Sequence, residues 1–199
     1  MICGQLTAAI ILAAGSSTRL GQSKQMVMID GQPLIVRAVK TALAAQADIV
    51  VVILGFDSEV HRRVLEGFPV QIVDNGSWER GMGSSLKEGV SFLARSSVEV
   101  QGAVVMVCDQ PLVTSEHIVN LVGTGVTLQK PIVASLYANS PGVPAYFHKN
   151  VFQFLLGIDD AHGAKNIFRI HAQNLATVPF AGGEVDIDLP TDLERFQRP

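Results

Sequence analysis

Three short, unbroken runs of apolar residues constrain the fold of this chain more than any other feature of its sequence. They span 8–14, 49–54 and 103–108, and turn-forming residues follow each of them. Strands that are buried on both faces of a parallel sheet have this continuous rather than alternating pattern. We therefore expect these runs to be central strands, with weaker strands at 70–73 and 131–136.

Helical patterns fill the gaps between these runs, at 33–45, 86–94 and 118–122. The alternation of strand and helix predicts right-handed βαβ units. The predicted fold is α/β, a single domain over 1–199 with a doubly wound, mostly parallel sheet and helices on both faces. The segment 140–163 is rich in Gly, Pro, Asn and Asp and is expected to be irregular, whereas the capping-box pattern at 191–194 predicts a short terminal helix.

Composition excludes several classes of function. The net charge is −3, so no positive field is available to bind nucleic acid. No apolar run approaches the roughly 20 residues that cross a bilayer, and no basic residue precedes Arg19, so we expect no membrane segment and no export signal. Cys3 and Cys108 have no metal-type spacing, which favours a reducing cytoplasm, and Cys108 is expected to be a buried packing residue.

A loop of small and basic residues follows the first apolar run. It reads Leu12-Ala13-Ala14-Gly15-Ser16-Ser17-Thr18-Arg19-Leu20-Gly21-Gln22-Ser23-Lys24. Small residues let backbone N–H groups approach an anion, and Arg19 and Lys24 add two cations, although the spacing fits neither a P-loop nor G-x-G-x-x-G. We predict that 12–17 hold a polyphosphate and that Arg19 and Lys24 neutralise it. The alternative is a surface loop with incidental basic residues.

Two acidic positions are candidate metal ligands. Asp109 directly follows a predicted central strand, where ligands of open α/β sheets bind, and Asp188 precedes the predicted terminal helix. Carboxylate oxygens suit Mg²⁺ or Mn²⁺ on a triphosphate. We predict Asp109 and Asp188 as direct ligands and Asp186 as the substitute candidate. The alternative for Asp109 is a helix N-cap or turn role, and the alternative for Asp186 and Asp188 is a polar segment that only leads into the last helix.

A predicted loop-to-helix junction at 81–85 is a further candidate for nucleotide binding. A glycine there permits close approach, and a helix N-terminus offers unpaired N–H donors. We predict nucleotide contacts from Gly81, Ser84 and Ser85, an ordinary N-cap role for either serine being the alternative. The histidines show no metal spacing, and His61, His117, His148 and His171 are expected to be solvated.

Five segments, in order, resemble the nucleotidyltransferases that condense a nucleoside triphosphate with a phosphorylated acceptor, and in particular the molybdenum cofactor cytidylyltransferases. They are the glycine loop, Gly81-Met82-Gly83-Ser84-Ser85-Leu86, Cys108-Asp109-Gln110-Pro111, Gly142-Val143-Pro144 and the segment 186–193. The end of a further family motif is present as His162-Gly163-Ala164-Lys165, whereas the Gly-Asp pair that opens this motif in the family is split or replaced.

The resemblance implies a nucleotide-diphospho-sugar transferase-like fold and transfer of CMP from CTP to molybdopterin, with release of pyrophosphate. It further implies dependence on Mg²⁺ or Mn²⁺, acceptor binding by Gly142, Pro144, His162, Gly163 and Lys165, and a molybdoenzyme or its maturation chaperone as a further partner. The guanylyl relatives carry Leu-Ala-Gly-Gly at the loop, so the methyl group of Ala14 favours the smaller base, with Ser85 near the edge of cytosine.

No general base is required for this reaction, because an acceptor phosphate with a second pKa near 6 is already an anion at pH 7. Catalysis then depends on cations and positioning, which assigns catalytic roles to Arg19, Lys24 and Asp109. Transfer of GMP, transfer to a sugar phosphate, and a non-catalytic nucleotide-responsive delivery protein are the alternatives. A pure binding module has no need for the complete set Arg19, Lys24, Asp109 and Asp188, so the set favours an enzyme.

Overall fold

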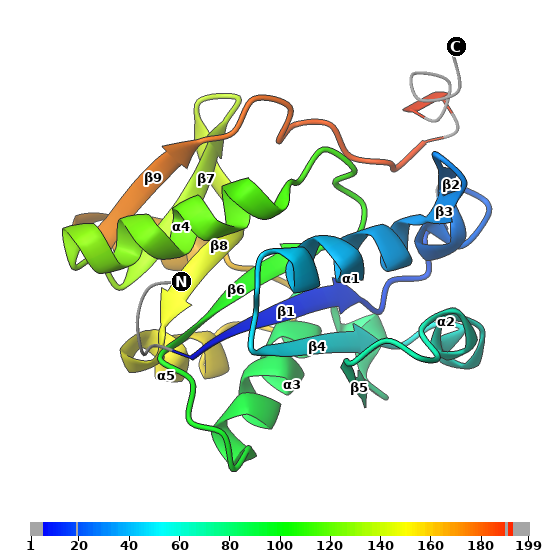
Figure 1. Cartoon of the computed structure of the whole chain (residues 1–199), viewed down its shortest axis with the longest axis horizontal. Helices are drawn as coiled ribbons and strands as arrows, with labels where there is room; N and C mark the ends of the chain where they lie inside the picture. The colour runs from blue at the N-terminus through cyan, green and yellow to red at the C-terminus, as the bar shows by residue number, and fades with distance from the viewer. Residues whose placement is uncertain (1–5, 19, 190, 193–199) are drawn as a thin grey trace.

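The computed structural model describes residues 6–18, 20–189 and 191–192 and is built around one seven-stranded sheet (Figure 1). Its strands, in spatial order, are β5 (Gln71–Asp74), β4 (Ile49–Leu54), β1 (Thr7–Ala13), β6 (Gly102–Val107), β8 (Ser140–His148), β7 (Ile132–Tyr137) and β9 (Leu175–Pro179). β1 pairs in parallel with β4 and β6, β4 with β5, and β7 with β9. The five predicted strands are thus confirmed, each to within one residue at either end.

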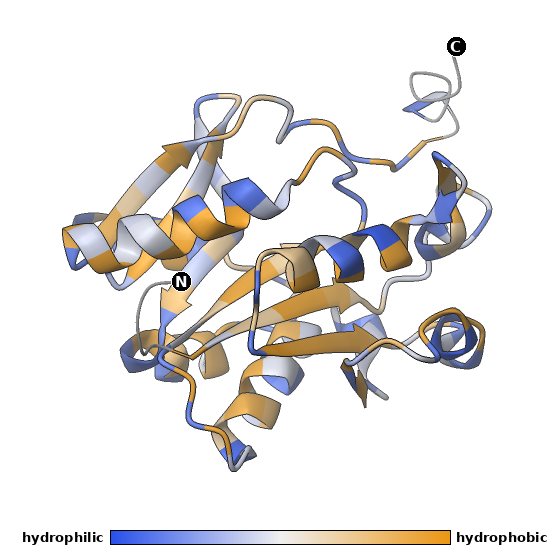
Figure 2. Cartoon of the chain, viewed as in Figure 1, coloured by the Kyte–Doolittle hydropathy of each residue, from blue (hydrophilic) through white to orange (hydrophobic). Residues whose placement is uncertain are grey.

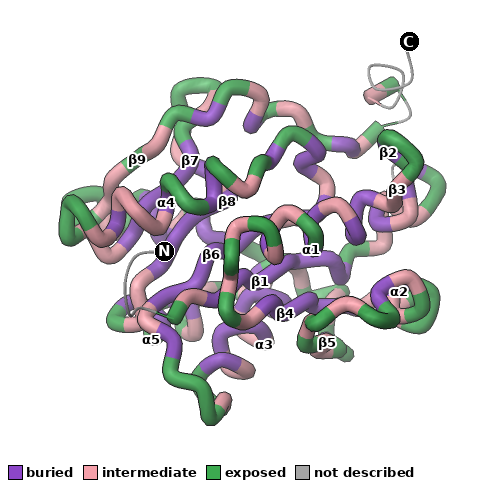
Figure 3. The backbone as a smooth tube through the Cα atoms, viewed as in Figure 1, coloured by how far each residue is buried: buried purple, intermediate pink, exposed green. Residues whose placement is uncertain are grey.

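The packing of β1 explains why the apolar run in its sequence is unbroken. Ile10 and Leu12 pack into one core, on one face of the sheet, whereas Ala9 and Ile11 pack into a second core on the other face. Both faces of the strand are therefore covered, as the continuous pattern requires. Figures 2 and 3 show these central strands as apolar and buried.

Helices cover both faces of the sheet, as predicted. α1 (Leu34–Ala44) and α4 (Ser115–Leu128) lie on one face, and α3 (Met82–Arg95), α5 (Phe152–Leu156) and α6 (Lys165–Ile170) lie on the other. α2 (Ser58–Val64), which follows β4, was not predicted. The remaining short elements are η1 (Lys24–Met26), β2 (Met28–Ile29), β3 (Gln32–Pro33), η2 (Trp78–Arg80), η3 (Lys149–Val151) and η4 (Ala172–Asn174).

The expectation of irregular structure over 140–163 is wrong for its first half. β8 is a nine-residue strand that pairs antiparallel with both β6 and β7, and α5 follows it. The sequence does not predict this strand, because Pro and Gly stand near its beginning and both residues are depleted in strands. Gly142 is needed there for packing, since a Cβ at this position would collide with the ring of Tyr137.

The carboxyl ends of β1, β4 and β6 lie at one edge of the sheet, and the C-terminal segment crosses this edge (Figure 1). Ile187 is fully buried in a small cluster with Leu20, Val27, Ile29 and Leu34. Thr191 and Asp192 are helical, consistent with the start of the predicted terminal helix, whose remaining predicted residues lie outside those described. Among the described residues, no helix is long and apolar enough to span a membrane.

Candidate active site

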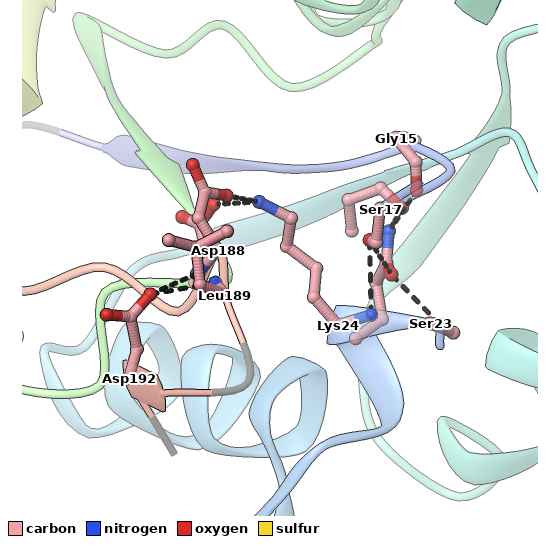
Figure 4. Close-up of polar contacts among 10 residues, drawn as sticks. Gly15, Ser17, Ser23, Lys24, Asp188, Leu189 and Asp192 are labelled. Carbon is pink, nitrogen blue, oxygen red and sulfur yellow. Dashed lines mark hydrogen bonds and ion pairs between the residues drawn. The ribbon is translucent and has the colours of Figure 1, made fainter. Parts of the chain in front are cut away.

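Lys24 lies between two carboxylates at the carboxyl edge of the sheet. Its Nζ is 2.6 Å from Asp109 Oδ2 and 2.6 Å from Asp188 Oδ1, and Figure 4 shows the side chain extended toward Asp188. The three side chains are 18%, 17% and 25% exposed. Burial opposes the charged form of Lys24, but the two carboxylates outweigh it and raise the pKa of this ammonium group above its ordinary value. The cluster therefore carries one positive and two negative charges.

Backbone hydrogen bonds position the two carboxylates of this cluster. Asp109 lies two residues beyond the end of β6, and its backbone oxygen accepts a hydrogen bond from the N–H of Ile187 at 3.0 Å. That bond aligns the C-terminal segment with the end of β6, while burial of the Ile187 side chain fixes the neighbouring residues. Asp188 is further held because Asp192 Oδ2 accepts from the N–H groups of Asp188 and Leu189, at 3.1 and 2.8 Å (Figure 4).

Side-chain hydrogen bonds to the backbone fix the conformation of the glycine loop. Gln25 Nε2 donates to the carbonyl oxygens of Ala13 and Gly15, at 2.9 and 2.8 Å. Ser17 adopts a left-handed φ of 54°, and its Oγ accepts from the N–H of Lys24 at 3.1 Å (Figure 4). Sequence reasoning missed Gln25, although a glutamine that directly follows a predicted catalytic lysine was the available signal.

The predicted loop residues differ in accessibility. Leu12, Ala13 and Ala14 are buried, Gly15 is exposed, and Ser16 and Ser17 are half-buried. Ligand contact is therefore available mainly from Gly15 onward and from backbone atoms. Arg19, predicted as a second phosphate-neutralising cation, lies outside the described residues.

The acidic residues fit a divalent cation that is shared with phosphate groups. Asp109 Oδ1 is buried and has no hydrogen-bond partner among the described residues, so it presents an unsatisfied acceptor. Burial and the charges of Asp188 and Asp109 raise the pKa of Asp186, so the negative charge of this cluster opposes ionisation of a third carboxyl group. In the described part of the chain, no group of three or more His, Cys, Asp or Glu is arranged to hold a metal. One or two carboxylates that share the ion with substrate phosphates, as Mg²⁺ prefers, match this arrangement.

The predicted helix junction at the start of α3 makes internal contacts. Ser84 Oγ donates to the carbonyl oxygens of Gly81 and Ser77, at 2.7 and 3.1 Å. Asn75 Nδ2 donates to the Oγ atoms of Ser84 and Ser85, at 2.8 and 2.9 Å. Both serines are buried, so their hydroxyl groups support the loop geometry, and their nucleotide contacts stay a prediction.

The segment where the acceptor motif departs from the family pattern covers this junction. The carbonyl oxygen of Asp160 accepts from the N–H of Gly83 at 2.8 Å, which satisfies one donor of the α3 N-terminus. The Asp160 carboxylate forms ion pairs with Arg80, at 2.5 Å, and with Lys87. The segment is thus fixed to α3 by both its backbone and its charge.

The predicted acceptor residues do not form one surface. Gly142 and Pro144 are buried within β8, and the carbonyl oxygen of Pro144 accepts from Ser135 at 2.6 Å. His162 and Lys165 are exposed, and Gly163 is half-buried. An acceptor can therefore contact the 162–165 region directly, whereas a role for Gly142 and Pro144 would be indirect.

Two of the histidine expectations are wrong. His61 is fully buried, with Nε2 2.7 Å from Ser23 Oγ, and His117 is buried, with Nε2 2.7 Å from Ser135 Oγ. Polar partners within the fold replace the water that was expected around both rings. Cys108 is buried as predicted, and burial together with the adjacent Asp109 charge raises the pKa of its thiol.

Comparison with known proteins is consistent with this geometry. The "Purine catabolism protein PucB" of Bacillus subtilis (strain 168) is 27% identical over 203 residues, covering 95% of each chain. The "Probable molybdenum cofactor guanylyltransferase" of Bacillus cytotoxicus is 26% identical and covers 72% of this chain and 69% of its own length.

The fold is likewise shared with solved structures. The crystal structure of a homologue of Mycobacterium tuberculosis rv0371c, from Mycobacterium sp. strain JC1, superposes with a TM-score of 0.81 at 26% identity, covering 95% of this chain and 93% of the other. The family model of the MobA-like NTP transferase domain matches residues 9–177, which contain the glycine loop, Asp109 and the whole sheet except the first two residues of β1 and the last two of β9. The chain therefore belongs to the MobA-like NTP transferase family and is a nucleotidyltransferase by descent.

Proposed function

We propose that this protein transfers CMP from CTP to the phosphate group of a pterin acceptor, molybdopterin, and releases pyrophosphate. The observation that carries the proposal is the cluster of Lys24, Asp109 and Asp188 next to a glycine loop at the carboxyl edge of the sheet. Ligands of open α/β sheets bind at this edge. We propose that residues 1–199 act as one domain.

In the proposed reaction, an oxygen of the acceptor phosphate attacks the α-phosphorus of CTP. The new P–O bond forms as the bond from the α-phosphorus to the oxygen that bridges to the β-phosphate breaks, and pyrophosphate leaves. Lys24 neutralises charge on the triphosphate and its leaving group, and the backbone N–H groups of the loop orient the phosphate oxygens. We propose the same neutralising role for Arg19.

Asp109 and Asp188 are the residues that would hold Mg²⁺ or Mn²⁺. A bound divalent cation supplies Lewis-acid polarisation of phosphate oxygens in reactions of this class. The two aspartates also orient Lys24, so this ammonium group is fixed before the substrate arrives. Removal of divalent cations with EDTA is expected to abolish turnover, and added Mg²⁺ or Mn²⁺ to restore it.

The choice of base rests on Ala14 and the resemblance to the cytidylyl enzymes. Ala14 is 5% exposed, so little of its methyl group is available for contact with a bound base. A single methyl group is worth about 1–3 kcal/mol in a binding pocket, or roughly 10- to 200-fold in specificity. Because little of Ala14 is exposed, we expect a preference for CTP near the lower end of this range.

The test is release of pyrophosphate from CTP and from GTP, each with Mg²⁺ and molybdopterin. We expect faster release with CTP, and a partial shift toward GTP in the Ala14→Gly variant. The name of the B. cytotoxicus relative makes GTP the necessary comparison. Equal or faster release with GTP would reject the cytidylyl assignment but keep the transferase, whereas no release with any nucleoside triphosphate would favour a non-catalytic delivery protein.

A further inference from the structure

The glycine loop is connected to α2 by a buried polar network that the proposed chemistry does not use. Gln25, Ser23 and His61 form this network, and the side chains of Gln25 and His61 have almost no contact with solvent. Buried polar groups need partners, so the positions of their protons can be deduced from the partners available.

The orientation of the Gln25 amide follows from its two backbone partners. One end of the amide lies 2.9 Å from the carbonyl oxygen of Ala13 and 2.8 Å from that of Gly15. Carbonyl oxygens can only accept, so this end must be the NH₂ group, and both of its protons are used. The opposite atom, Oε1, is therefore an acceptor, and it lies 2.9 Å from Ser23 Oγ and 3.4 Å from Ser17 Oγ.

The direction of the next bond follows in the same way. Gln25 Oε1 carries no proton, so the Ser23 hydroxyl must donate its single proton to it. Ser23 Oγ can then only accept from His61 Nε2, which lies 2.7 Å away. His61 must therefore carry a proton on Nε2.

The second nitrogen of His61 indicates that the ring is neutral. Nδ1 is buried and has no hydrogen-bond partner among the described residues. A buried lone pair without a partner costs less than a buried charged N–H without one. Burial also lowers the pKa of His61, against the opposing charge of Asp57. The ring is therefore the neutral tautomer with its proton on Nε2.

We propose that His61 is a positioning residue for triphosphate binding, because its Nε2–H donates the first hydrogen bond of the series that joins α2 to the glycine loop. The inference rests on the proposed binding of a nucleoside triphosphate at this loop. His61 donates to Ser23, Ser23 to Gln25, and Gln25 to the carbonyl groups of Ala13 and Gly15. Lys24 lies between two members of this network in the chain, so the network positions both the loop backbone and its lysine.

Three variants separate positioning from simple packing. His61→Leu replaces the ring with an apolar side chain of moderate size and so removes the Nε2–H donor. His61→Gln can place an amide N–H near the position of Nε2. His117→Leu is the matched control, because His117 is also buried and also contacts a serine hydroxyl at 2.7 Å, but this serine, Ser135, lies in β7 and not in the glycine loop. The Kd for CTP with Mg²⁺ is measured by calorimetry without acceptor, together with the thermal midpoint.

We expect His61→Leu to raise the Kd for CTP about tenfold, or about 1.4 kcal/mol. His61→Gln should stay within about threefold of the unmodified protein, and His117→Leu within about twofold despite a lowered midpoint. Equal changes in Kd for the two leucine variants would overturn the proposal. If His61→Leu does not fold, Ser23→Ala breaks the same link at a half-buried position and should give the same tenfold change, and an unchanged Kd there would also overturn it.

The proton assignment has a separate readout. Long-range ¹H–¹⁵N spectra report which ring nitrogen is protonated, and the His61→Gln variant identifies the His61 signals. We expect the neutral Nε2–H form, and an Nδ1–H tautomer would contradict the proposed direction of the network. Failure of the unmodified protein to bind any nucleoside triphosphate would instead reject the proposed function, so the two failures are distinguishable.

Discussion

Replacement of Lys24 by methionine tests the central feature of the site. The substitution keeps an unbranched side chain of similar length but removes the ammonium group, so Asp109 and Asp188 lose the cation that lies 2.6 Å from each. We expect two consequences of opposite sign. The variant is less stable without divalent metal, and it gains more stability than the unmodified protein when metal is added.

The size of the first effect follows from exposure. An exposed ion pair is worth about 0–1 kcal/mol, whereas loss of one partner of a fully buried pair costs about 3–5 kcal/mol. The Lys24 side chain is 18% exposed, between these limits, so we expect a loss of about 2 kcal/mol in the free energy of unfolding. For a chain of this size, that corresponds to a fall of about 4–8 °C in the thermal midpoint.

The second effect follows from mass action. Without the ammonium group, two carboxylates at the same place attract a divalent cation, and an ion at ten times its Kd stabilises the fold by about 1.4 kcal/mol. Roughly half or more of the lost stability should therefore return on addition of Mn²⁺. In the unmodified protein, Lys24 competes for the same carboxylates, so its midpoint should change by less than about 1 °C under the same conditions.

Thermal unfolding in EDTA and in MnCl₂ measures both effects, and pyrophosphate release measures the catalytic one. Lys24→Met should lower kcat/KM about 100-fold, since one preorganised charge contact is worth roughly 3 kcal/mol. Lys40→Met is the matched control, because Lys40 is exposed and contacts Gln32 on the surface. The reasoning is refuted if Lys24→Met is as stable as the control in EDTA, or if metal stabilises both variants equally.

Three further predictions concern the surroundings of the site. Asp109→Asn should lower the rate of pyrophosphate release at least about 100-fold. The thermal midpoint should move by less than about 3 °C, because Asp188 still pairs with Lys24. A rate within about threefold of that of the unmodified protein would contradict this prediction. Gly83→Ala should lower the thermal midpoint, since its Cβ would collide with the carbonyl oxygens of Asp159 and His162. Alanine has the higher helix propensity, so a rise in the midpoint would show that no such collision occurs. Burial lowers the pKa of His117 below its unfolded value of about 6.5, so the unfolded state binds more protons and stability falls as the pH drops below that value. Chemical unfolding at pH 7 and pH 5 should show a smaller loss in the free energy of unfolding for His117→Leu than for the unmodified protein. An equal loss would exclude His117 as a cause of the pH dependence.

The parallel half of the sheet could be predicted because burial on both faces leaves a direct mark on the sequence. Residues of β1 from Ala8 onward alternate between two cores, so each of these positions is apolar and the strand can be recognised without any knowledge of its partners. α2 leaves no such mark. It is short and mostly polar, and its one fully buried residue, His61, is of a type that usually contacts solvent. Its burial depends on Ser23, 38 residues away in the sequence.

The candidate site was predictable in its membership but not in its internal bonding. Lys24, Asp109 and Asp188 each stand next to a recognisable local feature, and the structure brings them together across 85 and 164 residues of sequence. Their spacing in the sequence carries no information on which atoms meet. The contacts of Ser84 and Ser85 with Asn75 were equally hidden, because a serine at a helix start has the same sequence pattern whether its hydroxyl faces a ligand or the protein.

The arrangement of the C-terminal segment explains why Asp188, rather than Asp186, pairs with Lys24. Ile187 donates its N–H to the carbonyl oxygen of Asp109 and buries its side chain beneath the glycine loop, with Leu20 and Leu34. A fixed Ile187 leaves little freedom to the residues on either side. Asp188 is additionally held through its N–H by Asp192, whereas Asp186 is more exposed. One buried isoleucine therefore couples packing under the loop to the position of a carboxylate in the site, and a ligand that displaces Lys24 from Asp188 acts on a residue whose backbone is already fixed.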